Sequence, residues 1–165
     1  MKSAREAMFT DCYGTQLRRS ARALTRLYDE ALKRDGILLT QFSLLRALDR
    51  LGSATFHELA EEVALDKTTI SRNVKVLATA GWVVFEGTED LREKRILLSS
   101  AGAEKLAAAT ANWRVAQNRI RESAKEMFSK QDGDPLIEAL ETFQMLTLRG
   151  AQQSEATPRQ RRRKS

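Results

Sequence analysis

Apolar and polar positions alternate most regularly between Asp66 and Gly81. Ile70, Val74 and Leu77 recur at helical spacing and define one apolar face. The opposite face carries hydroxyl side chains and cations, namely Lys67, Thr68, Ser71, Arg72 and Lys75. Asp66 is a favourable N-cap residue, and glycine is common at the left-handed position that follows a helix. The pattern therefore predicts an amphipathic helix bounded at both ends.

The polar face of this helix suits the major groove of DNA, where hydroxyl groups, Arg and Lys bond to base edges and phosphates. We therefore predict DNA contacts from Lys67, Thr68, Thr69, Ser71, Arg72 and Lys75. An ordinary amphipathic helix with a solvated polar face would show the same pattern. The neighbouring segments decide between these two interpretations.

Two amphipathic segments precede this helix. The first is predicted to begin at the cap residue Thr40 and to end at Gly52. The second begins with Thr55-Phe-His-Glu58, which has the Ser/Thr-x-x-Glu form of a capping box. Ala64-Leu65 then leaves room only for a tight turn. Two short helices joined by such a turn make a helix-turn-helix, in which the second is the recognition helix.

A predicted β-hairpin follows the recognition helix. Segments 82–86 and 95–99 are rich in strand-forming residues, and the polar connection between them contains Asp90 and Arg92. An arginine at a hairpin tip can enter the minor groove of A·T-rich DNA. The hairpin can also be a packing element with a solvated tip, but its place after a helix-turn-helix favours a DNA-binding wing. We predict DNA contacts from Asp90, Arg92 and Arg95.

Helical segments flank this region on both sides, over residues 9–34 and 101–150. Apolar residues recur at intervals of seven in both, at Leu17, Leu24 and Ala31 and at Leu106, Trp113, Ile120 and Met127. A helix spanning the second set would be about 42 Å long, more than so small a domain can cover alone. These helices therefore predict a two-fold dimer, although they can also pack only on their own chain.

The predicted fold is mainly α (α+β), a winged helix-turn-helix with N- and C-terminal dimerisation helices. We place the N-terminal dimerisation helix at residues 1–34 and the DNA-binding domain at 35–100. The C-terminal dimerisation helices follow at 101–150, and a disordered basic tail at 151–165.

Composition narrows the functional classes. The 165 residues are 42% apolar and 30% charged, as expected for a folded, mostly helical protein. The chain contains neither an apolar run of about 20 residues nor a signal-peptide pattern, so we predict no membrane association. The single Cys12 excludes an intrachain disulfide and agrees with a reducing, cytoplasmic location.

The net charge of +6 is mostly a property of the C-terminus. Residues 156–165 contain five cations and no acid, so the rest of the chain is nearly neutral. Such a tail can hold nucleic acid non-specifically, or it can be a solvated terminus. The charge alone therefore does not predict DNA binding by the folded part.

Catalytic and metal-binding patterns are missing from the sequence. It has one His and one Cys, with no paired carboxylates, phosphate-binding glycine loop or metal-ligand spacing. We therefore expect no enzymatic activity, no cofactor and no metal site, and a zinc-sensing regulator would need more His or Cys ligands. The remaining alternative to a DNA-binding regulator is a winged helix that serves as a protein-interaction module.

The motifs resemble the multiple-antibiotic-resistance regulator (MarR) family. The resemblance covers about residues 9–150, and its sharp motifs lie within 39–102, such as Lys67-Thr-Thr-Ile-Ser-Arg72. The wing sequence from Asp90 to Gly102 is similar to that family's Asp-x-Arg…Leu-Thr-x-x-Gly signature, with Ser99 in place of Thr. The resemblance implies a homodimer on a palindromic operator, usually a repressor released by a small ligand or by thiol oxidation. It also implies that Asp90 holds Arg92 in place.

The signal that would control such a regulator has two candidates. Cys12 lies where the family's hydroperoxide-sensing branch keeps a reactive cysteine, although a lone cysteine can also be a small buried hydrophobe. We favour instead an organic effector, an aromatic carboxylate lodged between the dimerisation helices and the winged helix. The candidates for its counter-charge are Arg18, Arg19, Arg22 and His57, although His57 on a polar face can be a plain helix residue.

Overall fold

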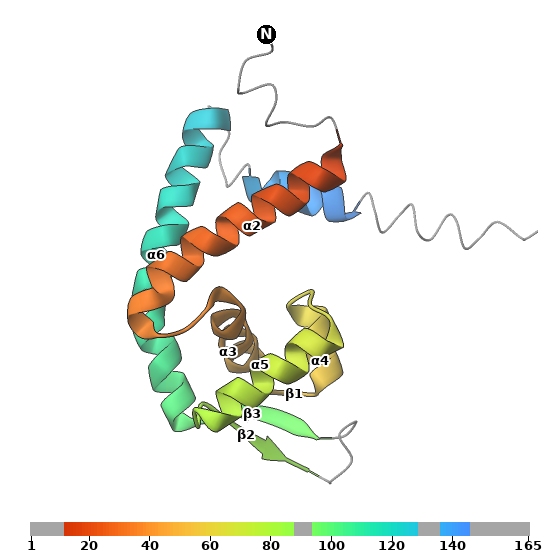
Figure 1. The fold of residues 1–165 in the computed structure, drawn as a ribbon, viewed down its shortest axis with the longest axis vertical. Coiled ribbons are helices and arrows are strands. Elements are labelled where there is room, and N and C mark those ends of the chain that lie inside the picture. Colours follow the sequence, from red (N-terminus) through yellow and green to blue (C-terminus); the bar gives the residue numbers. More distant parts are fainter. Residues whose placement is uncertain (1–11, 88–93, 129–135, 146–165) are drawn as a thin grey trace, which may run out of the picture. The chain divides into compact units, whose positions relative to one another are not determined.

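A computed structural model describes residues 12–87, 94–128 and 136–145 of the chain (Figure 1). The chain divides into two compact units, Met1–Ala116 and Gln117–Ser165. The helices of the first unit are α2 (Tyr13–Leu32), the 3-10 helix η1 (Lys33–Asp35), α3 (Leu39–Leu51), α4 (Phe56–Glu62), α5 (Lys67–Thr79) and the first part of α6 (Ser100–Phe128). Its strands are β1 (Ser53–Ala54), β2 (Val83–Glu86) and β3 (Arg95–Leu98). The second unit holds the end of α6 and a helix at 136–145.

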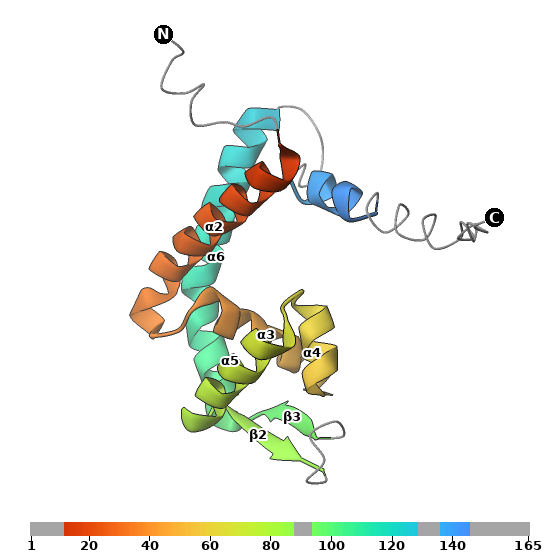
Figure 2. The same ribbon diagram turned by 45° about the vertical axis from the view of Figure 1, so that its right-hand side comes forward.

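The hydrophobic core of the first unit lies where α3, α4, α5 and the sheet meet. Views in Figure 1 and Figure 2 both show these elements gathered around one centre. The largest fully buried side chains include Phe42, Leu45, Leu59, Ile70 and Ile96. Among the described residues, every buried side chain in this core is apolar. Burial of apolar surface therefore fixes the three helices against one face of the sheet.

The sheet is antiparallel, with the strand order β1-β3-β2. Val83 of β2 pairs with Leu98 of β3, and Glu86 pairs with Arg95, so β2 and β3 form the predicted hairpin. Ser53 of β1 pairs with Leu97 on the other side of β3. A strand as short as β1 has no periodicity of its own, and the sequence therefore did not predict it.

The start of α3 differs from the prediction. Thr40 was expected to cap this helix, but the N-cap residue is Leu38 and the helix begins at Leu39. The amide of Leu39 donates to the Asp29 carboxylate over 2.7 Å, and the amide of Leu38 donates to the side chain of Gln41 over 3.0 Å. The Asp29 carboxylate of α2 therefore satisfies a helix-terminal amide that a local cap residue would otherwise satisfy. No local sequence pattern shows this contact.

The flanking helices follow the predicted pattern. α2 ends at Leu32, and η1 follows it to Asp35 with Gly36 as its C-cap residue, in agreement with the break predicted at Asp35-Gly36. α6 is 29 residues long, and its side chain Leu106 joins the core of the first unit. In the part of the chain that the structure describes, no helix is long and apolar enough to cross a membrane. The side chain of Met127 and the break predicted at 132–135 lie outside the described residues.

Gly102 lies in the first turn of α6, against the backbone of Trp82. A Cβ atom at this position would overlap the carbonyl oxygen of Trp82 and stand 2.9 Å from its carbonyl carbon. The side chain of Leu98 would be 3.0 Å away. Only glycine lets α6 begin this close to the start of the wing.

We predict that Gly102→Ala lowers the free energy of unfolding by about 1–3 kcal/mol, because backbone must move to admit the methyl group. Gly14→Ala is the matched control, since open space surrounds Gly14 in α2. That control should raise the free energy of unfolding by less than about 1 kcal/mol, because alanine favours a helix more than glycine does. Urea unfolding followed by circular dichroism measures both effects, and equal midpoints for the two variants would contradict the packing argument.

Candidate nucleic-acid interface

The N-terminus of α5 is closed by Asp66, as predicted. Its carboxylate accepts hydrogen bonds from the Thr69 amide, over 2.9 Å, and from the Thr69 hydroxyl, over 2.7 Å. These bonds, first that of the hydroxyl and then that of the amide, lower the pKa of Asp66 because they stabilise the carboxylate. The Thr69 hydroxyl proton is used in the bond to the Asp66 carboxylate. The DNA contact predicted for Thr69 stays a prediction.

The C-terminus of α5 is closed at Gly81, also as predicted. Gly81 has a φ of 74°, in the left-handed region. The Gly81 amide donates to the Ala78 carbonyl, and the Trp82 amide donates to the Leu77 carbonyl over 2.9 Å. This pair of bonds is a Schellman motif, which satisfies the last carbonyl groups of a helix. The recognition helix therefore has defined ends and passes directly into the wing.

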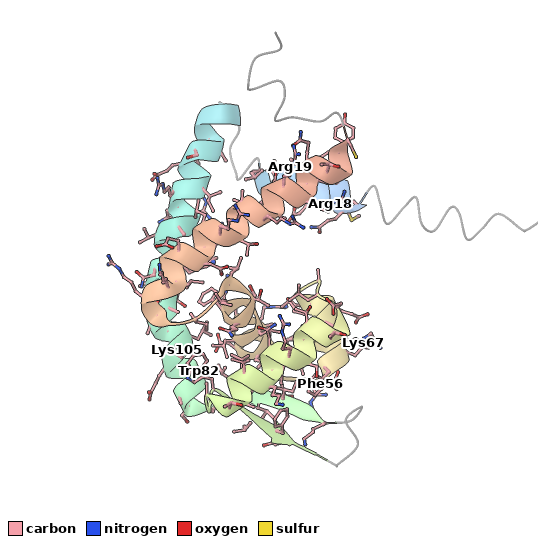
Figure 3. The ribbon with its side chains drawn as sticks, in the orientation of Figure 1. Arg18, Arg19, Phe56, Lys67, Trp82 and Lys105 are labelled. Carbon is pink, nitrogen blue, oxygen red and sulfur yellow. The ribbon has the colours of Figure 1, made fainter. Side chains whose placement is uncertain are left out.

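The two faces of α5 separate as the sequence predicted. Ile70, Val74 and Leu77 are at most 1% exposed. The opposite face is exposed and carries Lys67, Thr68, Ser71, Arg72 and Lys75. Figure 3 shows Lys67 at the N-terminal end of α5. These hydroxyl and cationic side chains are free of the core, and they supply the donors that phosphates and base edges accept.

The turn between α4 and α5 makes the helix-turn-helix. The Thr55 amide donates to the Glu58 carboxylate over 2.7 Å, and the Glu58 amide donates to the Thr55 hydroxyl over 3.2 Å. This confirms the predicted capping box of α4. After α4, Ala64 adopts a φ of 52°, and the Leu65 amide donates to the Ala60 carbonyl. The left-handed Ala64 reverses the chain within a few residues and sets α5 beside α4.

The wing supplies one described DNA-binding candidate. Asp90 and Arg92 lie outside the described residues, so their roles stay predictions. Arg95 is described, and its guanidinium donates to the Ser53 hydroxyl over 2.8 Å and to the Ser53 carbonyl over 2.9 Å. It also lies 3.6 Å from the Glu58 carboxylate. The predicted DNA contact of Arg95 is untested, and its protein partners were not predicted.

The four candidate ligand-binding residues come from two helices. Arg18, Arg19 and Arg22 are exposed on α2, and Figure 3 labels the first two. His57 is exposed on α4, with its Nε2 atom 3.6 Å from the Glu61 carboxylate. A ligand held by all four would therefore have to contact both α2 and α4. Among the described residues, no group of three His, Cys, Asp or Glu side chains could hold a metal ion.

Cys12 is the N-cap residue of α2, and it is exposed in this chain. Its carbonyl accepts hydrogen bonds from the amides of Thr15 and Gln16, each over 3.0 Å. Hydrogen bonds from Thr15, first through the hydroxyl and then through the amide, lower the pKa of the Cys12 thiol. Its position within this chain is therefore not that of a small buried hydrophobe.

Contacts across the first unit include two clusters that the sequence did not predict. The Arg46 guanidinium lies 4.3 Å from the ring centroid of Trp113, which stacks on Phe42. The Lys105 ammonium donates to the Asp35 carbonyl over 2.6 Å and lies 4.9 Å from the ring centroid of Trp82 (Figure 3). Each cluster joins α6 to a segment about 70 residues earlier, at Asp35 or at Phe42, so no local pattern could reveal it.

Comparisons with known proteins agree with this geometry. Residues 35–93 match the sequence profile of the MarR family. The uncharacterised helix-turn-helix-type transcriptional regulator YwoH of Bacillus subtilis is 31% identical over 90 residues, which cover 54% of this chain and 66% of that protein. The solved structure of the transcriptional regulator MosR of M. tuberculosis is 28% identical, with a TM-score of 0.69, over 88% of this chain and 98% of that chain. The chain belongs to the MarR family.

Two further structures of this fold contain DNA. MosR in complex with DNA is 29% identical to this chain, with a TM-score of 0.64, over 89% of this chain and 100% of that chain. A mutant MarR of E. coli complexed with operator DNA is 22% identical, with a TM-score of 0.65, over 82% of this chain and 92% of that chain. This MarR-family protein is a DNA-binding transcriptional regulator and not an enzyme. The predicted family and winged helix-turn-helix fold are confirmed.

We predict that Arg72→Ala weakens binding to a duplex selected by the protein from a random library by about 1–3 kcal/mol. Binding to a scrambled duplex should fall much less, because Arg72 is exposed on the recognition face of α5. Arg34→Ala removes the same charge from η1 and serves as the control. Fluorescence anisotropy titrations measure both duplexes, and equal losses for selected and scrambled DNA would mean that Arg72 contacts only phosphate.

Proposed function

We propose that this MarR-family protein is a repressor that binds a palindromic operator as a homodimer and leaves it when a small aromatic carboxylate binds. The observation that carries the proposal is the exposed face of α5, where cations and hydroxyls stand on a helix closed by Asp66 and by Gly81. A helix held in this way presents its side chains to a groove without rearrangement. The wing beside it adds a second contact to the same duplex.

Exposed apolar side chains support a homodimer. Leu17 on α2 is 43% exposed and Val115 on α6 is 69% exposed. Leu17 belongs to the heptad-like series that continues with Leu24, and a second copy of the chain would remove such side chains from water. A dimer with two recognition helices about 34–36 Å apart would match successive half-sites of a palindrome.

A change in this spacing would release the operator. An effector does so only if it binds the non-matching arrangement more tightly, and a nearly complete shift takes about 5.5 kcal/mol of differential affinity. Arg18 and Arg22 are exposed one helical turn apart on α2, so both can face the same anion. Arginine pairs with a carboxylate through two parallel hydrogen bonds, which favours an aromatic acid over a neutral ligand.

A redox signal through Cys12 is the second candidate. Its thiol is exposed at the start of α2, and hydrogen bonds from Thr15 favour the thiolate. A thiolate attacks a hydroperoxide, takes up one oxygen as sulfenic acid and releases the alcohol. Such a change would occur on the helix that we assign to the dimer interface.

The operator is tested by selection and titration. The protein should recover a palindromic sequence from genomic fragments and bind it about 10³-fold or more above a scrambled duplex at physiological salt. Light scattering of the complex should give two chains of 18.6 kDa per duplex. Recovery of random fragments, with an equally salt-sensitive affinity for all of them, would instead favour the protein-interaction module.

The two signals are separated by Cys12→Ser. We expect this variant to keep operator release by aromatic acids such as benzoate or salicylate, because the arginines of α2 are unchanged. Release by cumene hydroperoxide, if the wild type shows it, should disappear. Mobility shifts with each compound measure the outcome. A wild-type protein that responds only to the peroxide, through Cys12, would overturn the aromatic effector.

A further inference from the structure

The base of the wing is attached to the helix-turn-helix through Arg95. This residue opens β3 and pairs with Glu86, the last residue of β2. Its guanidinium donates to both the hydroxyl and the carbonyl of Ser53, a residue 42 positions earlier in the sequence. Ser53 lies in β1, two residues before Thr55, the N-cap of α4. A single side chain thus joins the point where the hairpin leaves the sheet to the point where α4 begins.

Glu58 completes this cluster from α4. Its Oε2 atom accepts the Thr55 amide over 2.7 Å and lies 3.6 Å from the Arg95 guanidinium. The pKa of Glu58 is lowered, first by the hydrogen bonds of Thr55 and then by the positive charge of Arg95, so the carboxylate stays ionised near neutral pH. The capping box therefore holds a negative charge where the guanidinium arrives.

The opposite face of the hairpin is also attached to α4. Phe56, the first residue of α4, stacks on Phe85 of β2 with 6.4 Å between ring centroids. Phe85 pairs with Ile96, which is buried, so both side chains lie on the same face of the sheet. Arg95 precedes Ile96 in β3, and its side chain therefore points to the other face. The start of α4, labelled by Phe56 in Figure 3, thus contacts the wing from both of its faces.

We propose that Arg95 is a positioning residue for operator binding, which fixes the angle of the wing relative to the recognition helix through Ser53 and Glu58. The inference rests on the proposed function, since it concerns the same operator complex. Arg95 then raises affinity without contacting DNA itself. A loose hairpin would have to be ordered when DNA binds, and that ordering would reduce the affinity.

Arg95→Lys separates positioning from a contact with phosphate. Lysine keeps the positive charge but lacks the planar fork that reaches two acceptors of Ser53 at once. Glu58→Gln removes the charge opposite Arg95 while keeping the capping box, which glutamine also forms. Ser53→Ala removes one acceptor of the cluster. Glu61→Gln is the matched control, because Glu61 is an exposed acid of α4 whose carboxylate lies 3.6 Å from His57.

Each variant is titrated by anisotropy against a duplex that the wild type selects from a random library, at several salt concentrations. Arg95→Lys, Ser53→Ala and Glu58→Gln should each weaken binding about threefold to tenfold, with an unchanged slope of affinity against salt. Glu61→Gln should stay within about twofold of the wild type. The Arg95→Lys/Glu58→Gln double variant should bind no more weakly than Arg95→Lys alone, because both changes break one contact.

Thermal unfolding before each titration confirms that the variants are folded at the assay temperature. If Glu58→Gln is unfolded at that temperature, the affinity of Ser53→Ala tests the inference instead. Wild-type affinity in all three variants would overturn the inference. Arg95→Gln, which removes the positive charge, is titrated in the same way. A loss confined to Arg95→Gln, with a salt slope reduced by about 0.9, marks a phosphate contact and would also overturn the inference. A wild type that prefers no duplex would instead overturn the proposed function.

Discussion

The recognition helix, the wing and α6 meet at one backbone junction around Trp82. The Trp82 amide closes α5 through the Leu77 carbonyl, and the Trp82 carbonyl accepts the Ser99 amide over 3.1 Å. The Ser99 hydroxyl donates to the Gly81 carbonyl and accepts the Gly102 amide. Gly102 has no room for a side chain here. The directions of the recognition helix, the wing and α6 are thus set by a few consecutive hydrogen bonds.

A second set of contacts joins this junction to the end of the N-terminal helix. Lys105 of α6 lies over the Trp82 ring and donates to the carbonyl of Asp35, and Asn112 donates to the Asp35 carboxylate over 2.9 Å. The segment between α2 and α3 is therefore held by α6 rather than left as a loose connection. A change in the arrangement of α2 must therefore either move α6 together with Asp35 or break these contacts.

Local chemistry made much of the DNA-binding unit predictable. The apolar spacing of Ile70, Val74 and Leu77 gives α5 its buried face, and Asp66 and Gly81 have the side chain and the φ that the two ends of a helix require. Thr55 and Glu58 form their capping box within four residues. Each of these features depends on neighbours in the chain, so the residue pattern is sufficient evidence for it.

The sequence by itself thus determined the helix-turn-helix, the hairpin and the exposed recognition face. Only the tertiary structure decided that the Asp29 carboxylate accepts the first amide of α3, that Ser53 and Ala54 form a third strand, and that Arg95 turns to Ser53 and Glu58. The partners in these contacts are not neighbours in the chain, and Arg95 and Ser53 are 42 residues apart. A cation facing water and a cation facing a distant carboxylate have the same sequence pattern, and only the packing of the chain distinguishes them.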